Sequence, residues 1–243
     1  MKDSFAGQMK RELGALGIAL DERQLEQFYR YYERLIETNK VMNLTAITEE
    51  HEVVTKHFVD SLSLVYVVSG WNEGKEYSVI DVGTGSGFPG IPLKIAFPGV
   101  KMTLLDSLNK RVNFLREVCG ELGLSGVEAV HGRAEDFGRA EEYREKFDYG
   151  VSRAVANLAV LCEYCLPFVR VGGMFVAYKS GEVEEEIKGA ERAIDVLGGK
   201  VEKVFSFVLP GTEMKRSFVV IRKERKTAKK YPRKAGVPGK EPL

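Results

Sequence analysis

Apolar residues recur at intervals of three and four along the first 70 positions, the spacing of helices with one buried face. One run follows Asp21, a residue type that favours a helix N-cap, and includes Leu25, Phe28 and Leu35. We therefore predict an N-terminal subdomain made of helices, over residues 1–74.

After residue 76 the pattern changes to short apolar runs that alternate with helix-like segments. The predicted strands are 77–82, 101–106, 127–131, 147–152, 172–179, 201–208 and 216–222. The predicted helices between them are 90–97, 109–122, 154–169 and 182–197. Continuous apolar runs are typical of parallel strands that are covered on both faces, and strand–helix alternation indicates a doubly wound α/β sheet. The last two strands lack a helix between them, so we expect an antiparallel hairpin at one edge. The prediction is a seven-stranded, mostly parallel sheet over residues 75–222.

The composition is that of an ordinary globular protein, with 243 residues, 44% hydrophobic and 29% charged. No apolar run approaches the roughly 18 residues that span a membrane, and the first ten residues lack the apolar core of a signal peptide. Three cysteines are few and suggest a reducing compartment. We expect a cytoplasmic protein without membrane contact.

Charge is distributed unevenly along the chain. Residues 222–234 hold eight Lys or Arg residues against one Glu, although the net charge of the whole chain is only +1. The apolar pattern also ends there, so we predict that residues 223–243 form a basic tail that is disordered without its partner. Nucleic acid is the first candidate partner, and a solvated tail that only aids solubility is the alternative. The candidate RNA-binding residues are Arg222, Lys223, Arg225, Lys226, Lys229, Lys230, Arg233 and Lys234.

The first predicted strand ends in an acid, Asp81, and then breaks into alternating glycines, Gly83, Gly85 and Gly87. Glycine permits positive φ and lets a ligand approach the backbone. A dinucleotide fingerprint would need a further glycine at position 88, where this chain has Phe88. The pattern Asp-x-Gly-x-Gly-x-Gly resembles the first motif of S-adenosylmethionine-dependent methyltransferases. The alternative is a glycine-rich surface turn without a ligand.

Ligands of open α/β sheets bind at the carboxyl ends of the strands, where three further candidates stand. Asp106 ends the second strand and could accept hydrogen bonds from ribose hydroxyls, or it could cap the following helix. Ala134 and Glu135 follow the third strand and could read an adenine edge, or form an exposed acidic turn. Arg153 ends the fourth strand and could contact a methionine carboxylate, an RNA phosphate or a target base, or make a structural salt bridge.

Several motifs are absent or weak. The fourth strand is not followed by the Asn/Asp-Pro-Pro-aromatic motif of amino-group methyltransferases, or by the Pro-Cys pair of a cysteine-nucleophile enzyme. Cys162 and Cys165 lie among apolar residues, so we expect core packing and no metal site. His57 and Asp60 are one helical turn apart, and could line a cleft or form a surface or capping contact.

Taken together, these motifs resemble the ribosomal RNA small subunit methyltransferase G family, also called glucose-inhibited division protein B. The matching pieces run in family order over 43–47, 57–62, 81–92, 106–111, 133–135, 152–154 and 231–236. The resemblance implies a Rossmann-like class I methyltransferase fold and guanine-N7 methylation of 16S ribosomal RNA with S-adenosylmethionine. It also implies that Gly83 and Phe88 contact the cofactor, Ala134 and Glu135 hold the adenine end, and Arg153 lines the methionine side. Phe88 stands where many members have Leu, and both are apolar.

Guanine N7 carries an exposed lone pair, so the reaction needs no general base to create a nucleophile. We expect in-line transfer without a covalent intermediate, and assign no residue as catalytic acid or base; Arg153 is a candidate for positioning. We expect a monomer that acts on 16S ribosomal RNA or the small ribosomal subunit. The alternatives are a class I methyltransferase with a protein or small-molecule substrate, and a non-catalytic RNA-binding ribosome-assembly factor.

Overall fold

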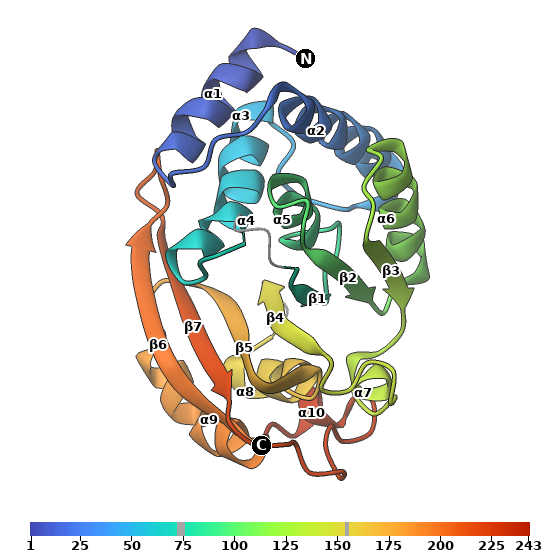
Figure 1. The fold of residues 1–243 in the computed structure, drawn as a ribbon, viewed down its shortest axis with the longest axis vertical. Helices are drawn as coiled ribbons and strands as arrows, with labels where there is room; N and C mark the ends of the chain where they lie inside the picture. Colours follow the sequence, from blue (N-terminus) through green and yellow to red (C-terminus); the bar gives the residue numbers. More distant parts are fainter. Residues whose placement is uncertain (72–75, 154–155) are drawn as a thin grey trace.

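A seven-stranded sheet forms the centre of the computed structural model, which describes residues 1–71, 76–153 and 156–243 (Figure 1). The strand order is β3-β2-β1-β4-β5-β7-β6. The strands are β1 (Ser78–Val82), β2 (Lys101–Asp106), β3 (Val127–His131), β4 (Phe147–Arg153), β5 (Val169–Ser180), β6 (Gly199–Val208) and β7 (Lys215–Lys223). Neighbours from β3 to β5 pair in parallel, and β7 pairs antiparallel with both β5 and β6. Each predicted strand overlaps an observed one, and the mostly parallel sheet with an antiparallel edge hairpin is confirmed.

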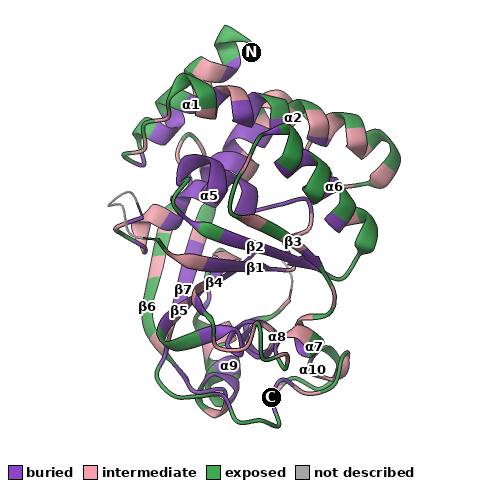
Figure 2. Cartoon of the chain, turned by 45° about the vertical axis from the view of Figure 1, so that its right-hand side comes forward, coloured by how far each residue is buried: buried purple, intermediate pink, exposed green. Residues whose placement is uncertain are grey.

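Helices cover both faces of the sheet (Figure 2). One face carries α1 (Asp3–Gly14), α2 (Glu22–Met42), α5 (Gly90–Ala96) and α6 (Asn109–Glu121). The other carries α7 (Ala134–Phe137), α8 (Leu158–Cys165), α9 (Glu184–Val196) and α10 (Val237–Lys240). Successive strand residues alternate between the two apolar clusters, with Val79 in one and Ile80 in the other. Cys162 and Cys165 are fully buried in the second cluster, so their predicted core packing is confirmed.

The N-terminal helices pack into the same apolar cluster as β1 and α5. Asp21 caps α2 as predicted, because its Oδ1 accepts from the Gln24 backbone N–H at 2.7 Å while the Gln24 side chain accepts from the Asp21 N–H. Beyond α2, four short helical pieces follow one another: α3 (Glu50–Val53), η1 (Val54–Val59), α4 (Asp60–Leu62) and η2 (Ser63–Tyr66). The predicted domain boundary at 74 and the predicted helix start at 154 lie outside the described residues.

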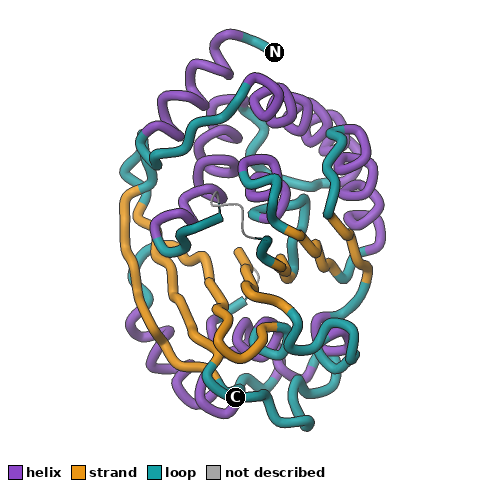
Figure 3. Tube along the Cα trace, in the orientation of Figure 1, coloured by secondary structure: helices purple, strands orange, loops and turns teal. Residues whose placement is uncertain are grey.

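The prediction that residues 223–243 are disordered is wrong. Lys223 is the last residue of β7, and the chain beyond it folds back beside α7 and α8 as a loop that ends in α10 (Figure 3). Carboxylates and carbonyl groups from distant parts of the chain hold this segment, so a basic composition did not imply lack of order. Among the described residues, no helix is long and apolar enough to cross a membrane.

Candidate active site

A large cavity, of about 900 Å³, lies at the carboxyl ends of β1, β2, β3 and β4. The strand order reverses between β1 and β4, and this is where open α/β sheets bind their ligands. Seven of the eight residues predicted to bind a cofactor line it: Gly83, Gly85, Phe88, Asp106, Ala134, Glu135 and Arg153. Sequence reasoning therefore located the cavity, although the residues come from four separate strand ends.

The glycine loop depends on positive backbone angles. Gly83 has φ +72° and Gly85 has φ +63°, a region that side chains with a Cβ rarely adopt. The Gly83 N–H donates to the Leu105 carbonyl at 2.8 Å, which ties the loop to β2. A Cβ on Gly85 would have no atom within 4 Å, and Gly85 lines the cavity. The loop thus leaves room for a ligand beside its backbone.

Gly87 is not part of the cavity lining, so its contact with a cofactor stays a prediction. A Cβ there would lie 2.6 Å from Ile91 Cδ1 and 2.7 Å from the Tyr31 hydroxyl. Tyr31, from α2, is fully buried, and its hydroxyl donates to the Ser86 carbonyl at 2.5 Å. Gly87 therefore allows a helix of the N-terminal region to hold the loop from behind. Tyr31 was missed because its sequence signal is that of an ordinary core position.

Asp81 supports the loop from inside the sheet. Its Oδ2 accepts from the Thr84 hydroxyl at 2.7 Å and from the Gly90 N–H at 2.8 Å. Burial raises the pKa of this carboxyl to about 7, against the lowering effect of the two hydrogen bonds. Among the described residues, its Oδ1 has no hydrogen-bond partner. The first acid of the motif is thus a buried structural support.

Asp106 lies in the cavity wall and ties the glycine loop to the turn before α6, while its role toward ribose stays a prediction. Its Oδ1 accepts from the Leu108 N–H at 2.9 Å, a contact in the turn before α6, whose N-cap is Leu108 and which has no side-chain cap, so the N-cap alternative is wrong. Its Oδ2 accepts from the Gly85 N–H at 2.9 Å, and the residue also lines the cavity. Glu135 is only 3% exposed, so the alternative of an exposed acidic turn is wrong for this residue.

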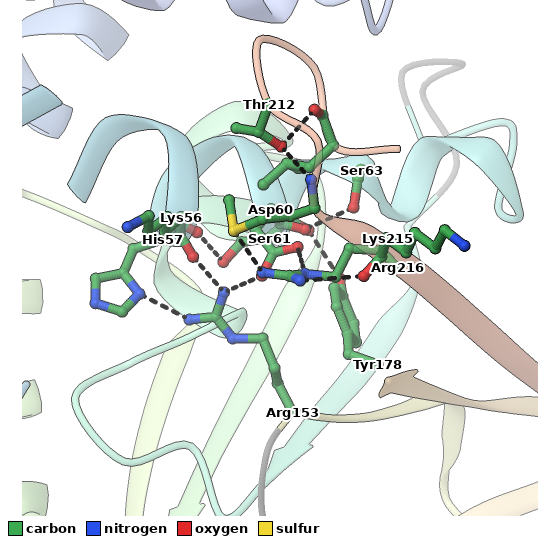
Figure 4. Close-up of polar contacts among 12 residues, drawn as sticks. Lys56, His57, Asp60, Ser61, Ser63, Arg153, Tyr178, Thr212, Lys215 and Arg216 are labelled. Atoms are coloured by element: carbon green, nitrogen blue, oxygen red, sulfur yellow. Dashed lines mark hydrogen bonds and ion pairs between the residues drawn. The ribbon is translucent and has the colours of Figure 1, made fainter. Parts of the chain in front are cut away.

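Four side chains from three segments meet beside this cavity, and two of them, His57 and Arg153, line it (Figure 4). Arg153 Nη1 lies 3.1 Å from Asp60 Oδ2, and Arg216 Nε lies 2.9 Å from Asp60 Oδ1. Arg153 Nη2 also lies 3.3 Å from His57 Nδ1. The open question about His57 and Asp60 is thereby answered, because both hold the Arg153 guanidinium. Arg216 was missed, since a single arginine in an apolar strand carries no sequence signal.

His57 is held as a neutral ring in one tautomer. Arginine has only donors, so His57 Nδ1 accepts and the ring proton lies on Nε2, which donates to Thr45 Oγ1 at 2.8 Å. Burial, and next the Arg153 charge, lower the pKa of His57 to about 3. The ring stacks on Phe88 with centroids 4.5 Å apart. His57 thus offers a fixed surface to the cavity and carries no charge near neutral pH.

A second cavity of about 440 Å³ adjoins this network. His57 and Arg153 line both cavities. Lys56, Lys179 and Arg216 add positive charge to its wall, and Lys179 Nζ donates to Glu186 Oε1 at 2.6 Å. Its aromatic lining residues are Tyr178, Phe207 and Phe218. A polyanion with planar bases matches this combination of charges and rings.

The eight residues that were predicted to bind RNA fall into three groups in the structure. Lys226, Lys229, Lys230 and Lys234 are exposed and make no ion pair with any described residue. Arg222 pairs with Glu202, and Arg225 pairs with Asp195.

Lys223 and Arg233 belong to the fold rather than to a free basic surface. Lys223 is 0% exposed, and its Nζ donates to the Leu166 carbonyl at 2.6 Å, so the prediction that it contacts RNA is wrong. Burial lowers the pKa of Lys223 to about 8. Arg233 is paired through two nitrogens with the carboxylate of Glu163, which corrects its assignment as a free cation.

Comparisons with known proteins agree with this geometry. The family model described as rRNA small subunit methyltransferase G matches residues 24–218. The ribosomal RNA small subunit methyltransferase G of Alkaliphilus oremlandii is 53% identical, over 97% of both chains. That of Alkaliphilus metalliredigens is 54% identical, over 94% of both chains. Among solved structures, an O-methyltransferase from Bacillus cereus in complex with SAH shares the fold, with a TM-score of 0.54 and 18% identity. The match covers 79% of this chain and 90% of that one.

Proposed function

The chain belongs to the rRNA small subunit methyltransferase G family, and we propose that it methylates guanine N7 of 16S ribosomal RNA with S-adenosylmethionine. The observation that carries this proposal is the pair of cavities that share His57 and Arg153 as lining residues. One cavity has the features of a cofactor site, and the other has those of a nucleotide site. The choice of N7 rests on the family resemblance.

The first cavity fits an adenosine-containing cofactor. Its volume of about 900 Å³ is within the range of small-molecule sites. Gly85 leaves open space beside the loop, and the carboxylates of Asp106 and Glu135 can accept from hydroxyl or amine donors. S-Adenosylmethionine supplies a methyl group that is activated by a positively charged sulfur.

The second cavity suits the RNA. Cationic groups of Lys56, Lys179 and Arg216 can neutralise phosphate, and the partly exposed ring of Phe207 can stack against an unpaired base. Asp60 holds Arg153 and Arg216 at fixed positions, one on each carboxylate oxygen. A base in this cavity would approach the methyl group past Arg153 and the neutral ring of His57.

The chain has little acid–base work to do in this reaction. With S-adenosylmethionine bound, the guanine N7 lone pair would form a bond to the methyl carbon, and the carbon–sulfur bond would break with its electron pair left on sulfur. No proton is taken from N7, which agrees with a His57 ring that is already neutral. The protein contributes positioning, since well-aligned reactants gain effective molarities of about 10⁵–10⁸ M. We expect a cytoplasmic monomer for this task.

A transfer assay with methyl-labelled S-adenosylmethionine tests the proposal. The acceptors are free 16S ribosomal RNA and small subunits, both from a strain that lacks the gene. We expect labelled 7-methylguanosine in at least one of them. Label in protein alone, or RNA binding without any transfer, would refute the proposal in favour of a protein methyltransferase or an assembly factor.

A pair of neighbouring variants on β7 tests the second cavity. Arg216→Met removes a cation that lines it, and Lys215→Met changes the exposed residue next to it. We expect Arg216→Met alone to slow methyl transfer, with cofactor affinity unchanged in both. Equal transfer rates for the two variants would rule out the second cavity as the RNA site.

A further inference from the structure

The C-terminal segment, residues 224–243, is bound to the body of the protein by two arginines. Arg139 Nε donates to the Pro232 carbonyl at 2.7 Å, and Arg144 Nη1 donates to the Tyr231 carbonyl at 2.9 Å. The Tyr231 ring packs against the second apolar cluster and is nearly buried. The segment is thus fixed as far as residue 232 by contacts that are remote in sequence.

A buried carboxylate fixes the next residue. Glu163, from α8, is 1% exposed, and its Oε1 accepts from the Arg233 backbone N–H at 2.7 Å. The Arg233 guanidinium closes the contact, with Nη2 2.6 Å from Oε2 of the same carboxylate. Charge-assisted bonds in this two-pronged geometry are strong and specific. Residue 233 is therefore the last of the firm anchors before the chain turns toward the cavity.

Beyond that anchor the segment reaches the large cavity itself. The Gly236 N–H donates to Glu135 Oε1 at 2.8 Å. Gly239 lines the cavity together with Glu135 and Tyr164, and a Cβ on Gly239 would lie 3.5 Å from the Tyr164 hydroxyl. Pro238, next to Gly239, is buried. Gly239 thus forms part of the cavity wall, next to the turn that follows β3.

We propose that residues 235–243 are part of the cofactor site and hold its adenosine end. The Gly236 bond fixes one oxygen of Glu135, and the other, Oε2, has no hydrogen-bond partner among the described residues. An ionised carboxylate only accepts, so its free oxygen selects a donor such as an amine or hydroxyl of a nucleoside. The inference rests on the proposed function for the identity of the cofactor.

This arrangement couples the C-terminus to cofactor binding. If residues 235–243 strengthen binding, then the bound cofactor stabilises their docked position by the same free energy. Binding should therefore slow hydrogen exchange at the Gly236 amide, which is an observable independent of methyl transfer.

A chain that ends at Lys234 tests the inference, because it keeps the anchors at Tyr231 and Arg233. The binding of SAH and of 5′-methylthioadenosine is measured by calorimetry on this chain and on the full chain. We expect both ligands to bind about tenfold more weakly to the shorter chain, the effect of a lost interaction of about 1.4 kcal/mol. An equal loss for both ligands locates the effect at the adenosine end, since methylthioadenosine lacks the amino-acid part. Unchanged affinity for both would overturn the inference.

If the shorter chain does not fold, the variant Gly239→Trp in the full chain tests the same inference. The indole would enter the cavity beside Tyr164, and Lys240→Ala, at the next exposed residue, is the matched control. We expect weaker binding in Gly239→Trp alone, with both variants melting near the wild type. Equal affinities would overturn the inference. A full wild-type chain that binds neither ligand would instead contradict the proposed function.

Discussion

Comparing Gly85→Ala with Gly123→Ala should separate the effect of backbone strain on stability from the effect of a filled cavity on cofactor affinity. Gly85 and Gly123 have nearly identical φ angles, +63° and +62°, and a Cβ at either position has no atom within 4 Å. Gly85 lines the large cavity, whereas Gly123 is exposed after α6. Gly123→Ala is therefore a matched control, with the same strain and no effect on the cavity.

The backbone strain should cost both variants about 1–2 kcal/mol of unfolding free energy. For a chain of this size that corresponds to a fall in Tm of roughly 2–8 °C. Only in Gly85→Ala does the added methyl group occupy ligand space. Forcing a methyl group into a filled site costs about 1–3 kcal/mol, which weakens binding by about 5- to 150-fold.

The assay combines thermal unfolding without ligand and calorimetric titration with SAH. We expect similar Tm values for the two variants and weaker binding for Gly85→Ala alone. Equal affinities would refute the reasoning, since the open space at Gly85 would then not belong to the ligand.

Three further predictions follow from single contacts. Tyr31→Phe removes the donor to the Ser86 carbonyl and should lower the unfolding free energy, measured in urea, by about 1–3 kcal/mol. Tyr32→Phe, on the same helix, is the control and should have a smaller effect. Equal effects of the two variants would contradict this role of Tyr31. A variant with glutamine in place of four exposed lysines, Lys226, Lys229, Lys230 and Lys234, tests their contact with RNA. The slope of the logarithm of the binding constant for single-stranded RNA against the logarithm of the salt concentration should become shallower by about 3. An unchanged slope would exclude these contacts. Between pH 6.5 and pH 3, the wild-type chain takes up a proton at His57 only when it is unfolded, so its unfolding free energy should fall as the pH falls. His57→Gln lacks this proton uptake and should therefore gain stability relative to the wild type over the same range. A difference in unfolding free energy that stays constant with pH would contradict the buried neutral ring.

The fold was largely predictable because its signals are local. Each strand is a short apolar run, and the glycine loop after β1 marks the point where such sheets bind ligands. The same reasoning located Asp106 and Arg153, which each end a strand, and Glu135, which lies in the short helix after β3. The spacing of glycines does not tell which of them faces a ligand: Gly85 lines the cavity, whereas Gly87 lies against Tyr31.

The remaining features depend on contacts between distant residues. Asp60 meets Arg153 and Arg216 at separations of 93 and 156 residues, and no local pattern records either pairing. The C-terminal segment has the composition of a disordered tail, yet Glu135 and Glu163 fix it from 101 and 70 residues away. Whether such a basic segment is ordered depends on the residues elsewhere in the chain that bind it, and these cannot be identified from the composition of the segment.

The most direct test of the central claim is nucleoside mass spectrometry of 16S ribosomal RNA from a strain that lacks the gene. The strain is complemented with the wild type, with Gly85→Ala or with Gly123→Ala. The account predicts that 7-methylguanosine is lost on deletion, is restored by the wild type and Gly123→Ala, and is restored less fully by Gly85→Ala. An unchanged level of 7-methylguanosine in the deletion strain would contradict it.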